Sequence, residues 1–318
     1  MAEAQGDYDE IFIYMGGEQQ VPDGVRRARI HKSVKIVRAR AFQNRQQLIS
    51  VEFHDGVEII EKAAFWNCVR LKSIKLLGVK IIKEWAFEYC HCLTDVEFGD
   101  KLEAIQQQAF FHCNALKNIR MTTVRTIGDR AFANCSELTD LEFGEALRIE
   151  EYAFWNCRKL KRIAVSLKGN MIGDHVFYGC PMLATIDLVG GIHQTVTSFH
   201  MDSWRSDMMD EINSINQSLP TTDAGRMKTA AIQQWMETVI RRLDHYKAEH
   251  QTLLKEATTL LELALWKANL RDNNGGEGER EGVRTTRGSR KRARKEICVT
   301  SGADIVIKNV LPFLQLSE

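Results

Sequence analysis

Cysteine is the residue of this chain with the widest chemistry, because its thiolate can bind a metal ion, attack an electrophile or form a disulfide. The sequence holds eight cysteines. Six of them recur at intervals of 22 or 23 residues: Cys68, Cys90, Cys113, Cys135, Cys157 and Cys180. A zinc site needs further ligands beside a short pair, and Cys90 and Cys92 have no second pair. We therefore expect buried structural thiols, with no metal site, no cofactor and no catalytic residue.

The same period organises the apolar residues around these cysteines. Seven phenylalanines lie three residues before the cysteine column, with Arg45 in place of the first cysteine: Phe42, Phe65, Phe87, Phe110, Phe132, Phe154 and Phe177. A leucine follows each phenylalanine by six residues, and the run L-x-x-I-x-F/L has the alternation and residue types of a strand. A period of this length predicts a solenoid whose strands stack in parallel about 4.8 Å apart.

The full repeat, A-F-x-x-C-x-x-L-x-x-I, resembles the BspA-like class of leucine-rich repeats over about residues 25–190. The resemblance implies an α+β fold: a leucine-rich-repeat solenoid with one short parallel strand per 22–23-residue repeat, followed by a C-terminal helical region. Val25, Ala28 and Ile30 match the strand columns one period upstream, so they predict a partial first strand. The segment 11–14 is apolar and is expected to cover the N-terminal edge.

Composition and spacing predict six segments along the chain. These are an N-terminal cap (1–24), the repeats with seven clear copies and a partial first strand (25–190), a degenerate repeat and capping helix (191–220), a long amphipathic, coiled-coil-like helix (221–271), a disordered basic linker (272–296) and an apolar docking segment (297–318). Residues 227–268, together with the apolar tail that follows the linker, resemble the C-terminal region of a set of intracellular BspA-like proteins from diatom-type algae. That resemblance implies an architecture but no activity.

Composition narrows the class of protein. A net charge of +1 and 44% hydrophobic residues are typical of a globular chain. The sequence has no run of 18 apolar residues, so we expect no membrane span. The acidic N-terminus lacks a signal-peptide core, which predicts an intracellular protein, cytoplasmic and/or nuclear. Phosphate loops, dinucleotide-binding glycine patterns and hydrolase motifs are all absent from the sequence, so we expect no enzyme.

The side chains between the apolar strand positions are expected on the concave side of the repeats. One column alternates in sign, and such charges on neighbouring strands pair with each other. The candidate partner-binding residues are Glu52, Lys72, Lys75, Asp95, Glu97, Asn118, Arg120, Asp140, Glu142 and Arg162. Two interpretations stay open, a self-neutralised solvated face or a groove for a protein or peptide. The nearly neutral face disfavours nucleic acid.

A second column, one residue after each phenylalanine, contains Trp66, Phe111, Trp155 and Tyr178. These aromatic residues are candidates for a lateral interface, since aromatic side chains often dominate binding energy. The alternative is half-buried ring packing between coils.

Residues 224–270 are expected to form one long helix. From Ile232 to Ala264 its apolar positions alternate four and three apart, which is the spacing of a coiled coil. We therefore expect a homodimer through 232–264 or, alternatively, packing of this helix on the repeats or on a helix before Pro220.

The C-terminal tail carries two further signals. Lys291, Arg292, Arg294 and Lys295 form the densest part of a basic cluster, which is typical of a localisation signal or of a plain solubilising run. The apolar residues Ile305, Val310, Leu311, Phe313 and Leu314 are expected to dock on a partner or on this protein's own surface.

These observations favour a non-catalytic scaffold or adaptor that binds a protein or peptide through its repeats, with helix-mediated assembly. The alternative is a nuclear protein that uses its basic tail on nucleic acid. A second alternative is a cell-surface or secreted adhesion and recognition module, which is the role of many proteins with such repeats but which the missing signal peptide disfavours.

Overall fold

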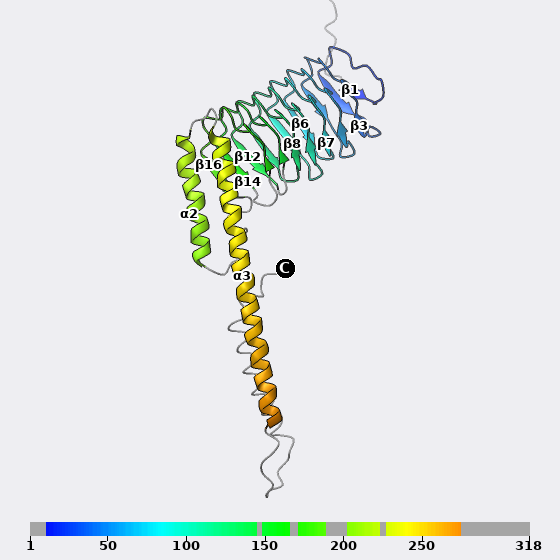
Figure 1. Cartoon of the computed structure of the whole chain (residues 1–318). Helices are drawn as coiled ribbons and strands as arrows, with labels where there is room; N and C mark the ends of the chain where they lie inside the picture. The colour runs from blue at the N-terminus through cyan, green and yellow to red at the C-terminus, as the bar shows by residue number, and fades with distance from the viewer. Residues whose placement is uncertain (1–10, 145–147, 166–170, 189–201, 223–226, 275–318) are drawn as a thin grey trace, which may run out of the picture. The chain divides into compact units, whose positions relative to one another are not determined.

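The computed structural model describes residues 11–144, 148–165, 171–188, 202–222 and 227–274. The chain forms two compact units, Met1–Gly191 with Met208–Val239, and Ile192–Asp207 with Ile240–Glu318. The repeats are a stack of flat coils, each with one longer and one two-residue strand (Figure 1). The longer strands are β1 (Ile11–Tyr14), β2 (Arg27–Ile30), β4 (Ser50–Glu52), β6 (Ser73–Leu76), β8 (Asp95–Phe98), β10 (Asn118–Met121), β12 (Asp140–Phe143), β14 (Arg162–Val165) and β16 (Thr185–Leu188).

The short strands form a second parallel sheet. They are β3 (Ile36–Val37), β5 (Ile59–Ile60), β7 (Ile81–Ile82), β9 (Ala104–Ile105), β11 (Thr126–Ile127), β13 (Arg148–Ile149) and β15 (Met171–Ile172). Their seven-stranded sheet runs without a break, whereas the longer strands form a five-stranded sheet, β1 to β8, and a four-stranded sheet, β10 to β16. Pairing joins equivalent columns, as in Ile74 with Val96 and Ile119 with Leu141. The parallel-strand solenoid expected from the sequence is therefore confirmed, and β1 extends it by pairing with β2.

The phenylalanine column forms the centre of the core. All seven rings are fully buried. Successive rings stack with centroids 4.8–5.9 Å apart and nearly parallel planes. Tyr14 closes the N-terminal end of this stack, 5.2 Å from the Phe42 ring. Because the ring spacing matches the spacing of parallel strands, each coil buries its apolar surface against the next one.

Two left-handed residues flank each phenylalanine, and this feature has no counterpart in the sequence analysis. The positions two before and two after it hold thirteen non-glycine residues with φ between 52° and 61°. This conformation is strained for most residues but tolerated by asparagine, which occupies four of the positions after phenylalanine: Asn44, Asn67, Asn134 and Asn156. The resulting tight turns aim the phenylalanine N–H at the next coil, so that Phe110 N donates to Ala131 O at 2.8 Å.

The cysteine column is buried beneath these turns. Each Sγ donates to the carbonyl oxygen of the phenylalanine one repeat earlier, at 3.1–3.4 Å, from Cys68 to Phe42 through Cys180 to Phe154. Burial raises the pKa of the Cys68 thiol to about 12, so it stays protonated. The seven cysteines in the described part of the chain are free. Their chemistry is therefore that of a compact hydrogen-bond donor, which explains why the column repeats.

The first coil replaces cysteine with an arginine that caps the N-terminal end. Arg45 Nε donates to Val21 O at 2.6 Å, and its guanidinium also contacts Gln43 O and the Asp23 carboxylate. Arg45 thus supplies several hydrogen bonds to the N-terminal segment where the later coils have a single thiol contact.

The C-terminal end of the repeats is capped by side chains of two helices, α2 (Asp202–Ser218) and α3 (Met227–Asn274). The Asn216 amide accepts from Ile186 N at 2.7 Å and donates to Ile186 O at 3.1 Å. The buried ammonium of Lys228 donates to Pro181 O and Leu183 O, and Thr229 Oγ1 accepts from Phe177 N at 3.0 Å. Side chains thus supply the hydrogen bonds that a further coil would make.

Helices α2 and α3 are joined through a short 3-10 turn, Leu219–Thr221, which contains Pro220. Trp235 Nε1 donates to Glu211 O at 3.1 Å, and the Tyr246 hydroxyl donates to Asp207 at 2.9 Å, so the two helices contact each other within each unit. The sequence placed the long helix at 224–270, and the structure has it at Met227–Asn274. None of the described helices is long and apolar enough to cross a membrane.

Substitution of the capping amide tests this account of the C-terminal end. Asn216→Ala leaves the N–H and C=O of Ile186 without their partners, so we expect it to lower the free energy of unfolding by about 1–3 kcal/mol. Urea denaturation followed by circular dichroism measures the change. Asn213→Ala removes the same amide from an exposed position of α2 and serves as the control. Equal stability of the two variants would contradict the capping role of Asn216.

Candidate functional site

The ten side chains expected on the concave side lie on or next to the longer strands, from β4 to β14, and are exposed or half-buried. Glu52 belongs to β4, Lys75 to β6 and Arg162 to β14, while Lys72 directly precedes β6. The remaining six lie on β8, β10 and β12: Asp95, Glu97, Asn118, Arg120, Asp140 and Glu142. We call the outward-pointing side chains of these strands, together with those of β2 and β16, the strand face.

On the strand face, one ion pair links each successive pair of strands: β2 with β4, β6 with β8, β10 with β12 and β14 with β16. Arg29 pairs with Glu52 at 2.6 Å and Lys75 pairs with Glu97 at 2.8 Å. Arg120 and Glu142 are 3.8 Å apart, and Arg162 pairs with Asp187. The Arg120 side chain is 86% exposed, so this cation is the least engaged of the four. Solvent weakens each exposed pair, which leaves the charged groups accessible to a partner.

Each longer strand from β2 to β16 carries charge of a single sign, and the sign changes at every strand. Arg27 and Arg29 make β2 positive, Asp95 and Glu97 make β8 negative, and Arg120 makes β10 positive. The sequence analysis found this alternation only in one column and only through Glu142. Combining adjacent columns strand by strand would have found all eight stripes. The break in the sheet lies between β8 and β10, at the middle of the pattern.

The lateral aromatic residues Trp66, Phe111, Trp155 and Tyr178 are half-buried. Two of them belong to a cluster over three coils, the lateral aromatic cluster, which consists of Trp66, Tyr89, His91, Phe111 and His112. Trp66 and Phe111 each meet Tyr89 edge to face with centroids 6.1 Å apart. The sequence analysis missed Tyr89 and His112 because they lie one residue later, in the left-handed column that is otherwise mostly asparagine.

His112 is the titratable centre of this cluster. Its ring stacks on Tyr89 with centroids 5.4 Å apart, and its Nε2 lies 3.3 Å from Asn134 Nδ2. A neutral imidazole nitrogen accepts this hydrogen bond, whereas a protonated one cannot. Burial lowers the pKa of His112, although a hydrogen bond with Asn114 opposes the shift and nearby His91 adds to it. The cluster is therefore built around a neutral histidine.

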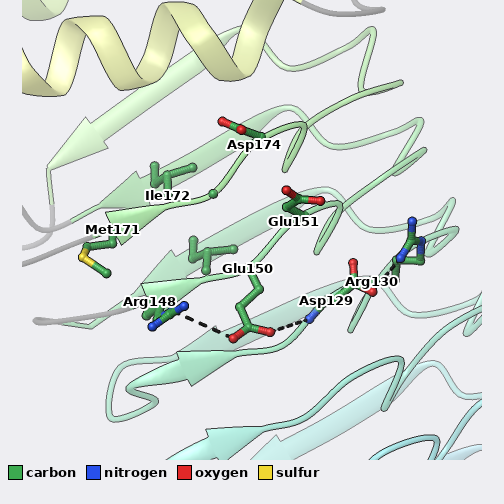
Figure 2. A pocket seen from close by; sticks show the side chains of 10 residues that line it. Asp129, Arg130, Arg148, Glu150, Glu151, Met171, Ile172 and Asp174 are labelled. Atoms are coloured by element: carbon green, nitrogen blue, oxygen red, sulfur yellow. Dashed lines mark hydrogen bonds and ion pairs between the residues drawn. The ribbon is translucent and has the colours of Figure 1, made fainter.

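A surface pocket of about 520 Å³ lies beside β13 and β15, on the side of the short strands (Figure 2). Two of its arginines are engaged within it: Arg130 pairs with Asp129, and Arg148 lies 3.9 Å from Glu150. The remaining charged lining residues are Glu151 and Asp174, both exposed. The lining contains no His, Cys, Ser or Thr.

The pocket differs from the strand face, where the sign of the charge alternates. Asp129, Glu151 and Asp174 occupy the same turn position in three successive coils. Met171 beside them is 58% exposed. Carboxylates therefore outnumber cationic groups in the lining, and no feature of the sequence analysis pointed to this pocket. Across the described ranges, no group of three His, Cys, Asp or Glu residues could hold a metal ion.

The two tail signals lie outside the described residues. These are the basic residues Lys291, Arg292, Arg294 and Lys295, and the apolar residues Ile305, Val310, Leu311, Phe313 and Leu314. The predicted localisation signal and docking segment therefore stay predictions.

The geometry defines a class of protein: a solenoid of 22–23-residue coils, each with a buried phenylalanine and a buried leucine ahead of its longer parallel strand. A family model described as a BspA type leucine rich repeat region matches residues 24–122 and 80–204. Together the matches cover more than half of the 318 residues, and the chain belongs to this family. No curated protein matches the chain.

Solved structures similar to this chain include two that are 29% identical to it. One is a leucine-rich-repeat protein of T. pallidum, with a TM-score of 0.43 over 47% of this chain and 72% of the other. The second is a leucine-rich cell surface protein from Faecalibacterium prausnitzii, with a TM-score of 0.43 over 55% of this chain and 49% of the other. The chain thus spans about half the length of the second protein. Membership of the family indicates a protein-interaction or recognition module, of a kind that is generally non-enzymatic.

The environment of His112 predicts a pH-dependent stability. Its folded pKa is depressed below the unfolded value of about 6.5. The unfolded chain therefore binds the proton more readily, and the stabilising contribution is present above about pH 6.5 and lost as pH falls through the folded pKa. We expect the wild type to lose more stability between pH 7.5 and 5 than His112→Asn, as measured by urea denaturation.

His175→Asn is the matched control, because His175 has the same left-handed backbone but is exposed. Equal pH dependence of the wild type and His112→Asn would show that protonation of His112 is not the cause.

Proposed function

We propose that this protein is a non-catalytic scaffold that binds a protein or peptide through its strand face. Membership of a leucine-rich-repeat family supports this role. The observation that carries the proposal is the row of eight stripes of alternating charge, with Lys75, Glu97 and Arg120 more than half exposed at its centre. Such a row offers a partner donors and acceptors in a fixed register, which favours specificity more than affinity.

A near-neutral strand face also limits the kind of partner. Adjacent stripes cancel at distances beyond a Debye length of about 8 Å, so the face exerts little long-range attraction on a polyanion. A nucleic-acid backbone or an anionic membrane would need a single sign along the whole face. A polypeptide with charges of both signs is the partner that this pattern supports.

We also propose helix-mediated assembly, through a shorter part of α3 than the seam 232–264 predicted from the sequence. Within the expected homodimer seam 232–264, Ile232, Met236 and Val239 are already buried in the unit that contains the repeats. Residues 250–264 are the part of the seam left for another apolar surface. Their half-buried or exposed leucines support contact there with a second helix or with another segment.

Location is proposed from the sequence alone. An intracellular location, cytoplasmic and/or nuclear, is supported by the basic cluster at 291–295, which is typical of a localisation signal. The nuclear alternative, with the basic tail on nucleic acid, depends on the same cluster. The cell-surface or secreted alternative remains the third candidate, and fractionation of a tagged full-length chain separates the three.

A charge-reversal experiment tests binding by the strand face. The double variant Arg120→Glu with Glu142→Arg keeps an ion pair within the molecule but inverts the stripe of β10 and neutralises that of β12, which also carries Asp140. We therefore expect the fold to persist and partner recovery to fall at least tenfold. Proteins captured by the wild type and by the variant are compared by quantitative mass spectrometry. Circular dichroism verifies the fold.

The matched control inverts an ion pair on the side of the short strands. Lys80 Nζ and Glu58 Oε2 are 2.8 Å apart, and Lys80→Glu with Glu58→Lys changes the same number of charges. Partners retained by this control but lost from the strand-face variant support the proposal. Equal recovery from all three proteins would exclude the strand face as the interface.

A further inference from the structure

The turns of α3 around residues 260–266 expose apolar side chains over most of their circumference, with Lys255, Thr259 and Glu262 on a polar side. Within residues 260–266, Leu260 is 65% exposed, Leu263 and Leu265 are each 51% exposed, and Trp266 is 61% exposed. These four account for more than a third of the eleven exposed large hydrophobic side chains in the described part of the chain. We call residues 253–266 the apolar end of α3.

A two-stranded coiled coil would not cover this surface. Successive residues of a helix are about 100° apart, so Leu260 and Leu263 lie on neighbouring positions of one side, whereas Leu265 points about 140–160° away from them. A coiled-coil seam covers about two positions in seven. A single matching seam therefore leaves part of this apolar surface exposed, and the apolar end of α3 calls for a further occupant.

The same chain contains a suitable occupant. Residues 303–316, with the sequence ADIVIKNVLPFLQL, form an apolar segment that lies outside the described residues, and residues 275–302 connect it to the end of α3. Among its fourteen residues only Asp304 and Lys308 are charged, and these two cancel. Apolar burial rather than ion pairing would therefore drive its association.

The connecting segment has the length that such an association needs. A polar chain of 28 residues with this glycine- and charge-rich composition has a root-mean-square span of about 30 Å. The apolar end of α3 lies about 12–32 Å back along the helix from Asn274, at 1.5 Å per residue. Effective concentration is greatest when the span of a linker matches the distance between the sites.

We propose that residues 303–316 dock on the apolar end of α3 in the same molecule, with Phe313 and Leu314 against Leu260, Leu263 and Trp266. A tethered segment acts at an effective concentration in the millimolar range. It therefore occupies this surface in preference to a second copy of equal intrinsic affinity at micromolar concentrations. The inference does not depend on binding by the strand face.

Hydrogen exchange of the full-length chain tests the proposal. At about 2 µM protein, the wild type is compared with Phe313→Asp and Leu314→Asp, with exchange read by mass spectrometry on peptides that cover 253–266. We expect exchange of these peptides to accelerate at least tenfold in both variants. Asn309→Asp adds the same charge within the segment at a polar position and is expected to leave exchange unchanged.

A variant on α3 tests whether faster exchange comes from loss of docking and not from a general loss of stability. Leu263→Asp alters an exposed side chain, so the repeats should keep their thermal transition, while exchange of peptides covering 303–316 should accelerate. Unchanged exchange at 253–266 in Phe313→Asp and Leu314→Asp would overturn the proposal. Protection that grows with protein concentration, with a dimer mass by analytical ultracentrifugation, would overturn it in favour of a second copy.

Discussion

The structure depends on one constraint: every coil must meet the backbone hydrogen-bonding groups of its neighbours. Phe110 N donates to Ala131 O in the following coil, and Phe87 O accepts from Cys113 Sγ there. Buried backbone groups without partners are strongly unfavourable, so a coil is stable only between two others or under a cap. The paired left-handed residues, the thiol column and the capping side chains are three ways in which this chain meets that constraint.

The ends of the repeats show the constraint most clearly. Arg45 at one end and Asn216, Lys228 and Thr229 at the other provide hydrogen bonds that the periodic columns cannot. Lys228 is 1% exposed, and burial lowers its pKa because the charged ammonium loses its water, while the carbonyls it binds partly compensate. Helix α3, which carries Lys228 and Thr229, continues to the apolar end at residues 253–266.

Repeating apolar and cysteine columns could be predicted from the sequence, whereas the repeating left-handed turns, the second strand of each coil and the features that occur once could not. The period from Phe42 to Phe177 was sufficient to predict the parallel strands, the buried rings and the buried cysteines. In the sequence, Arg45 is only an exception to the cysteine column. Its role is visible in the fold, where its side chain donates to Val21 O. Asn216 had no distinguishing neighbours in the sequence, and the pocket beside Glu151 combines residues from three coils. The residues predicted for the strand face and the lateral column are exposed or half-buried, and their roles in binding stay predictions.

The alternation of charge from strand to strand has a consequence for how such a chain can change in length. Loss or duplication of one coil would place two stripes of the same sign side by side, where like charges are unfavourable. Loss or duplication of two adjacent coils would keep the pattern intact across the junction. For this surface the natural unit of insertion and deletion is therefore a pair of coils, although the backbone itself would accept one.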